Sequence, residues 1–142
     1  MTSPIYAEYR LVVQEKPFRI PALNGILRLV WTYLYRCHES ASTATTKMQS
    51  LMKHFFPANR LTVFPQEDRI ELLAYIVHFI LSRHFDYGSE LCLELLQERS
   101  IPNLSSSNLA SHLSPDRISI AIQAILMSVK LLESEEPNPV WP

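Results

Sequence analysis

At residues 70–85 the sequence reads IELLAYIVHFILSRHF, and this stretch decides the fold. Its apolar residues recur at spacings of three and four, which is the period of an α-helix. It carries almost no charge between Glu71 and Arg83. A helix that is apolar on most sides is typically covered on more than one face. We therefore expect an all-α protein in which other helices pack around this one.

Helical patterns precede this stretch. Residues 22–37 carry one broad apolar face, and residues 46–56 carry a second pattern that Pro57 ends. The Ser/Thr-rich residues 40–46 between them are typical of a loop and a helix start. Because the connection is short, the two helices are expected to form an antiparallel hairpin.

A second hairpin is expected at residues 65–99. Asp86, Tyr87 and Gly88 are weak helix formers and predict the break between its two helices. Either Asp86 or Ser89 is suited to cap the helix that follows.

A fifth helix is predicted from Pro115 to Glu133. Ser114, Pro115 and Asp116 supply a capping residue, a proline at the first helical position and an acid in the first turn. This helix is strongly apolar and lacks a partner in a third hairpin. Residues 4–16 fit either strand-like alternation or a further helix, and we favour a helix.

The pattern resembles a cut from a helical solenoid, in which each unit buries one face on the next. We expect antiparallel hairpins stacked in a HEAT/armadillo-like manner, and the unpaired fifth helix suggests a fragment of a longer protein. The single helical-repeat segment 1–142 then divides into a lead (1–21), a first hairpin (22–56), a second hairpin (65–99), a fifth helix (114–133) and a tail (134–142).

The apolar positions of these helices define the expected core. Losing one such side chain is expected to cost about 2 to 5 kcal/mol. The positions that we expect to be buried include Trp31, Leu34, Ile76, Ile80, Ile122 and Ile125.

Composition excludes several classes of protein. The chain has 142 residues and only two glycines, so it lacks a phosphate-binding glycine loop and a dinucleotide fingerprint. Its serines do not occur in GxSxG or SxxK motifs. None of its apolar stretches approaches the roughly 20 residues of a membrane-spanning helix. We therefore expect a non-enzymatic, cytoplasmic protein without a membrane span.

Histidine and cysteine patterns do not indicate a metal or cofactor site. His78 and His84 are six positions apart, a spacing that places them on different sides of a helix. Cys37 and Cys92 each fall within an apolar helical pattern, where a thiol usually behaves as a small hydrophobic group. We expect no cofactor and no metal.

Charge is distributed unevenly along the chain. Residues 1–63 contain eight Lys/Arg and three Asp/Glu, whereas residues 64–142 contain five and eleven. Such asymmetry fits two partner surfaces, head-to-tail self-association, or simply two solvated faces that differ. A helical module that binds nucleic acid through the basic half is the main alternative function. The candidate contact residues on that half are Arg28, Arg36, Lys47, Lys53 and Arg60.

Several ordered segments carry a family resemblance. They read FRIPALNGILRLVWTYLYRCHES at 18–40, HFFP at 54–57, FDYGSELCLELL at 85–96 and LSPDRISIAIQAILMSVKLL at 113–132. Together they resemble the N-terminal region of Furry-type cell-morphogenesis proteins over roughly residues 18–133.

This resemblance implies part of a long, non-catalytic cytoplasmic scaffold of HEAT/armadillo-like repeats. Relatives of this kind act with NDR-type kinases and their Mob coactivators in polarised growth and cell shape. The expected partners are therefore such a kinase and coactivator, at the cell cortex or at sites of polarised growth. The resemblance does not assign a role to any single residue.

Overall fold

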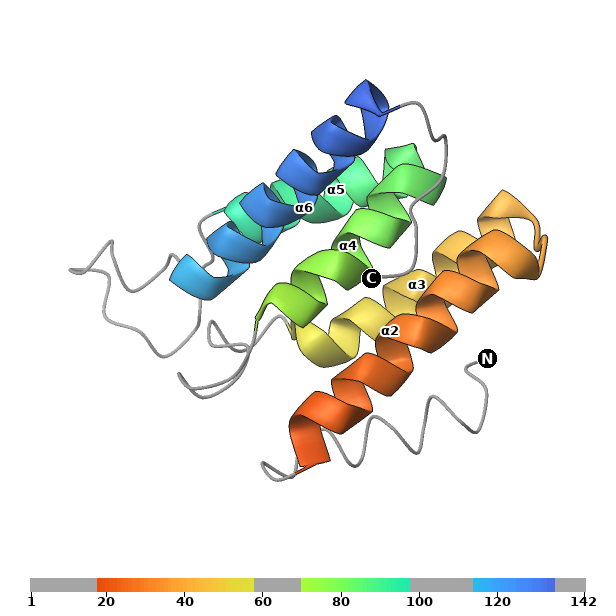
Figure 1. Ribbon diagram of the computed structural model, residues 1–142, viewed down its shortest axis with the longest axis horizontal. Helices are drawn as coiled ribbons and strands as arrows, with labels where there is room; N and C mark the ends of the chain where they lie inside the picture. The colour runs from red at the N-terminus through yellow and green to blue at the C-terminus, as the bar shows by residue number, and fades with distance from the viewer. Residues whose placement is uncertain (1–17, 58–69, 98–113, 135–142) are drawn as a thin grey trace.

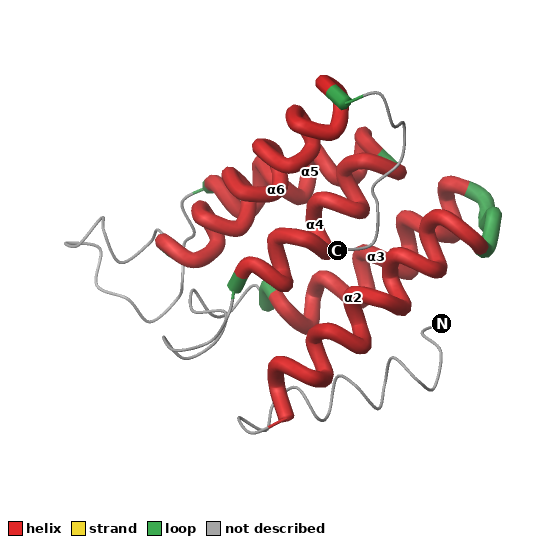
Figure 2. The backbone as a smooth tube through the Cα atoms, viewed as in Figure 1, coloured by secondary structure: helices red, strands yellow, loops and turns green. Residues whose placement is uncertain are grey.

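The fold is built around one central helix. A computed structural model describes residues 18–57, 70–97 and 114–134, and within them every regular element is a helix (Figure 2). The five helices are α2 (Arg19–Arg36), α3 (Ala41–Phe55), α4 (Glu71–Arg83), α5 (Phe85–Leu96) and α6 (Pro115–Glu133). The all-α prediction is confirmed for these residues.

Helix α4 is the most deeply buried element. Its closest neighbours are α2 on one side and α5 and α6 on the other (Figure 1). Ala74, Ile76 and Ile80 of α4 are all completely buried. The charge-poor stretch at 70–85 is thus covered on several faces, as its sequence predicts.

The other helices run in alternating directions. Helix α3 runs back towards the start of α2 after a short turn, and α5 runs back against both α4 and α6, which contact each other and run the same way (Figure 1). Helices α2 to α6 all contribute to one hydrophobic core. The stacking of these helices as HEAT/armadillo-like repeats stays a prediction.

Two polar contacts join distant segments. The guanidinium of Arg83 at the end of α4 donates to the carbonyl of Leu34 in α2, with 3.1 Å between Nε and the oxygen. Arg117 in the first turn of α6 is buried, and its Nη2 donates to the carbonyl of Pro57 at 2.7 Å. Hydrogen bonds from charged donors fix the relative position of helices.

The predicted boundaries are wrong at several places, and α2 begins at Arg19 and not at residue 22. Helix α3 begins at Ala41, not at residue 46, because the Ser40 hydroxyl accepts a hydrogen bond from the Thr43 N–H and caps the helix there. The break between α4 and α5 lies at His84, and Gly88 is inside α5. Residues 86–88 therefore do not break the helix, and neither Asp86 nor Ser89 caps it.

The predicted core is correct for α4, correct in part for α2 and wrong for α6. Leu34, Ile76 and Ile80 are buried, whereas Trp31 is only partly buried against the core. In α6, Ile122 and Ile125 are 47% and 37% exposed. The face that α6 turns inward carries Arg117, Ile120, Ala121 and Ala124.

The physical reason for the α6 error is the size of its inward residues. The small side chains of Ala121 and Ala124, both 0% exposed, let α6 approach α4 closely. Periodicity alone does not choose between faces in a helix that is apolar on nearly every side. Residues 1–17 of the predicted lead, residues 135–142 of the predicted tail and Arg60 lie outside the described residues.

Candidate functional site

An apolar groove lies between α5 and α6, above the end of α4. Its volume is about 780 Å³, within the range of sites that bind ligands or peptides. The α5 wall includes Phe85, Cys92, Leu93 and Leu96. The α6 wall includes Ile125, Val129, Leu131 and Leu132.

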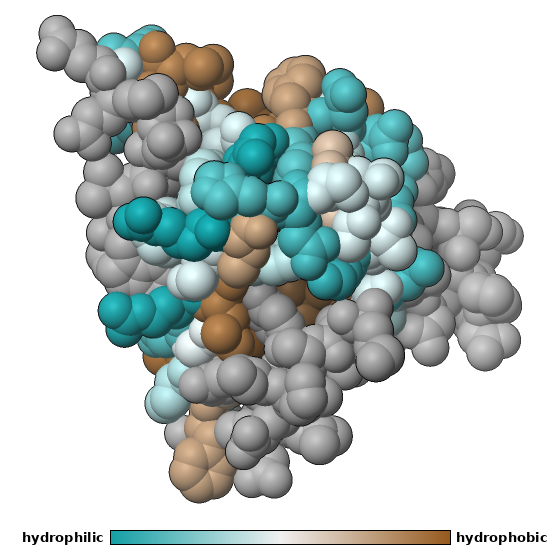
Figure 3. Space-filling view, turned by 90° about the vertical axis from the view of Figure 1, so that its right-hand side faces the viewer, coloured by the Kyte–Doolittle hydropathy of each residue, from teal (hydrophilic) through white to brown (hydrophobic). Residues whose placement is uncertain are grey.

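Large apolar side chains on both walls reach solvent. Phe85 is 69% exposed, Leu93 is 59% exposed and Leu132 is 85% exposed. Ile122 and Leu126 of α6 are also exposed, but they do not line the groove. Figure 3 shows hydrophobic residues at the upper edge of one face of the molecule and a narrower hydrophobic strip down its middle, between hydrophilic residues. Contiguous exposed apolar surface of this kind marks a binding face.

Hydrogen-bonded polar groups lie at the edge of the groove. Ser128 of α6 donates from its hydroxyl to the Ala124 carbonyl at 2.9 Å. Its hydrogen is thereby engaged, so we assign Nδ1 of His78 as the N–H that donates to the Ser128 oxygen at 2.8 Å. Ser82 lies 3.3 Å from the same nitrogen. These contacts pin α6 to α4 directly under the groove.

The titratable groups at the groove are held neutral. Burial lowers the pKa of His78 to about 4, so its imidazole is a weak base at neutral pH. Burial also raises the pKa of the Cys92 thiol to about 11, so the thiol is a poor nucleophile. The geometry therefore favours binding of an apolar partner over chemistry at this place.

Acidic side chains flank the groove. Asp86 and Glu90 are exposed on α5, one helical turn before the groove-lining Ser89 and Leu93. On α6, Glu133 is exposed one turn after Val129.

The basic residues singled out from the sequence lie on α2 and α3. Arg28 and Arg36 are exposed on α2, about 12 Å apart along the helix axis. The Arg36 guanidinium lies over the Trp31 ring, 5.4 Å from its centroid. Lys53 is exposed on α3, and Lys47 is partly buried six positions earlier. Six positions turn a helix by about 240°, so these two lysines point to different sides of α3.

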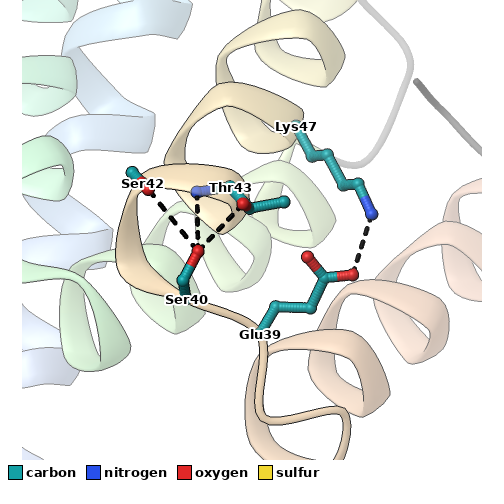
Figure 4. A network of polar contacts seen from close by, with 5 residues as sticks. All are labelled: Glu39, Ser40, Ser42, Thr43 and Lys47. Atoms are coloured by element: carbon teal, nitrogen blue, oxygen red, sulfur yellow. Dashed lines mark hydrogen bonds and ion pairs between the residues drawn. The ribbon is translucent and has the colours of Figure 1, made fainter.

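Lys47 is already engaged within the chain. Its ammonium donates to Glu39 at 2.9 Å and lies over the Tyr33 ring, 5.2 Å from the centroid. The hydrogen bond between Lys47 and Glu39 lowers the pKa of the Glu39 carboxyl group and raises the pKa of the Lys47 ammonium. Figure 4 shows this pair beside the Ser40 cap, where the Ser40 hydroxyl donates to Thr43 Oγ1 at 2.9 Å. These contacts fix the turn between α2 and α3.

A second, smaller hollow of about 360 Å³ lies where the α2–α3 turn meets the start of α5. Polar groups such as Glu39, Arg83 and Asp86 line much of it. Among the residues that the structure describes, no three His, Cys, Asp or Glu side chains gather as metal ligands. Within those ranges, too, no helix is long and apolar enough to cross a bilayer.

Sequence reasoning missed the groove. It placed Ile122 and Ile125 in the core and assigned the partner contacts to exposed charges. The signal that points to the groove is the pair Ala121 and Ala124, because small residues at inward positions leave the bulky ones outside.

Comparison with known proteins gives one family match. A family model described as Cell morphogenesis N-terminal matches residues 6–142. No solved structure matches the chain.

Proposed function

The chain belongs to the cell morphogenesis N-terminal family, and from this membership we propose that it is a non-catalytic protein-interaction segment in cell morphogenesis and polarised growth. The match confirms the resemblance to the N-terminal region of Furry-type proteins. The proposal adds to it a mode of action, which is binding to other proteins.

One observation carries this proposal. The groove between α5 and α6 is apolar, and the side chains on its walls include residues as exposed as Leu132 at 85%. Soluble proteins rarely leave such surface open unless another polypeptide or ligand covers it. The neutral His78 and the unreactive Cys92 give the groove no catalytic group.

We propose an NDR-type kinase with its Mob coactivator as the partners, in the cytoplasm at the cell cortex or at sites of polarised growth. The family resemblance supports this choice. A scaffold of HEAT/armadillo-like repeats suits the role, because stacked helices present extended surfaces.

Nucleic-acid binding through the basic residues receives less support. Lys47 is bound to Glu39, and Arg36 lies over Trp31. Phosphate recognition favours clustered cations on one face, whereas Lys47 and Lys53 point to different sides of α3.

A binding measurement on the full chain separates the two functions. The chain is immobilised and exposed to a purified NDR-type kinase with Mob, and separately to duplex DNA and single-stranded RNA at several salt concentrations. We expect saturable binding of the kinase–Mob pair with little loss at high salt. Binding of nucleic acid alone, with a steep salt dependence, would overturn the proposal. The double variant Arg28→Ala/Lys53→Ala is the control, since it removes exposed cations and leaves the groove intact.

A further inference from the structure

We infer that the groove between α5 and α6 binds one amphipathic helix of another protein, about three turns long, with basic residues on both flanks of its apolar stripe. This inference deepens the proposed interaction role and rests on it. It specifies the surface used and the chemistry of the partner.

The shape of the groove selects a helix. Its walls are two neighbouring helices, and the ridges of a third helix pack into the furrow between such a pair. The α5 wall extends from Phe85 to Leu96, a rise of about 16 Å, which equals about three helical turns. Apolar residues on both walls require a continuous apolar stripe on the partner.

Exposure shows that the described helices leave this surface without a cover. Leu93 and Leu132 stand on opposite walls at 59% and 85% exposure. If a partner covers these side chains, the binding free energy becomes more favourable by about 25 cal/mol for each Å² of apolar surface that is buried. The groove is held open because the His78–Ser128 hydrogen bond and the small residues Ala121 and Ala124 fix α6 against α4.

Charge around the groove selects the flanks of the partner. Asp86 and Glu90 stand beside the α5 wall, and Glu133 stands beside the α6 wall. The exposed cation of α6 is Lys130, next in sequence to Val129 but turned well away from the groove by the helical step. A helix in the groove meets acidic groups along both edges, so Lys or Arg on its flanks gains affinity and orientation.

The test uses fluorescein-labelled designed peptides of about 14 residues and the full chain 1–142. One peptide carries leucines at helical spacing with lysines on both flanks, and the other carries glutamates in place of the lysines. Fluorescence anisotropy is expected to show that the lysine peptide binds at least about tenfold more tightly than the glutamate peptide. Equal affinity, or binding of neither peptide, overturns the inference.

Two matched variants locate the site. Leu93→Ser removes a groove side chain, and Leu126→Ser removes a side chain of equal 59% exposure that does not line the groove. Leu93→Ser is expected to weaken the lysine peptide about tenfold and Leu126→Ser to leave its affinity within about twofold. Equal losses in the two variants contradict the assignment.

Charge reversal tests the acidic flank. Glu90→Lys is expected to weaken the lysine peptide and strengthen the glutamate peptide, a reversal that loss of folding does not produce. No change in either affinity contradicts the predicted flanks. Concentration-dependent dimers in sedimentation that disappear in Leu93→Ser would show a second copy in the groove and overturn the inference.

The outcomes also separate this inference from the proposed function. If the kinase–Mob pair binds the wild-type chain and Leu93→Ser equally, and the peptides do not bind, the interaction role stands and the groove assignment fails. If the lysine peptide binds as expected and the kinase–Mob pair does not bind, the groove assignment stands and the proposed partners fail.

Discussion

Gly88 of α5 lies directly against the backbone of Leu81 in α4. A Cβ atom placed on Gly88 would stand 2.4 Å from the Leu81 Cα and 2.9 Å from its nitrogen. Because these are backbone atoms, no side-chain rotation relieves the contact. The absence of a side chain at residue 88 therefore lets α5 fold back tightly on α4 after His84, and this return sets the position of the α5 wall of the groove.

Replacing Gly88 with alanine should destabilise the protein. Alanine favours a helix over glycine by about 1 kcal/mol, but the clash with Leu81 forces the two helices apart. We expect the net free energy of unfolding to fall by about 1 to 3 kcal/mol, measured by urea denaturation. The exposed Glu90→Ala on the same helix should stay within about 0.5 kcal/mol. A Gly88→Ala variant as stable as wild type would disprove the close contact.

Replacing one isoleucine in α4 and one in α6 with alanine should show, from the change in stability, which of the two is in the core. Ile76→Ala removes a fully buried side chain and should cost about 2 to 5 kcal/mol. Ile122 is 47% exposed, so Ile122→Ala should lower the free energy of unfolding by less than about 1 kcal/mol. Chemical denaturation of both variants gives the comparison. Similar large losses would mean that Ile122 is covered in the isolated chain.

His78 should make the protein less stable as the pH is lowered. The pKa of His78 is about 4 in the folded chain and near 6.5 when unfolded, so between these values the unfolded chain binds more protons. Stability from this residue is fully present above about pH 6.5 and is lost as the pH falls towards about 4. Each unit of pKa difference between the two states is worth about 1.4 kcal/mol, so we expect a loss of about 2 to 3 kcal/mol. Urea midpoints from about pH 7 to pH 4 measure it, and His78→Gln should flatten this part of the profile. An unchanged profile in His78→Gln would contradict the assignment.

The two cysteines should react at very different rates. Cys37 is exposed, whereas Cys92 is 3% exposed and burial raises its pKa to about 11. A thiol reagent at about pH 8 should modify one cysteine quickly and the second only after unfolding. Cys37→Ser should abolish the fast phase and Cys92→Ser should keep it. Loss of the fast phase in Cys92→Ser would show that the groove opens to its base.

Much of the fold is predictable from local pattern. The charge-poor α4 predicts a central helix, and Ser114 with Pro115 predicts the start of α6 at the observed residue. The Ser114 hydroxyl accepts the Arg117 N–H at 3.3 Å, which is the capping contact that the sequence suggests. Caps and periodicity depend on neighbouring residues alone, so sequence reasoning can find them.

Tertiary close approach is what the sequence pattern does not reveal. Gly88 is typical of a helix break in sequence, yet in the structure it is the contact point between two helices. In α6 the choice of inward face depends on how closely α4 approaches, and that distance is set by residues on both helices.

At the candidate site, too, some features can be predicted from the local sequence and others depend on tertiary packing. The sequence predicts exposed cations such as Arg28 and Lys53, and the structure places them on the surface of α2 and α3. It does not predict that Lys47 is held by Glu39 across the turn between those helices. The sequence does not predict the groove between α5 and α6, because the spacing of the apolar residues assigns Ile125, which lies on the α6 wall, to the core.

The central claim is that this chain acts by binding protein through the α5–α6 face. Hydrogen–deuterium exchange of the full chain, alone and saturated with an NDR-type kinase and Mob, tests it most directly. The account predicts slower exchange in residues 85–96 and in the second half of α6, with little change in α2. Protection confined to α2 and α3, around Arg28 and Lys53, would contradict it.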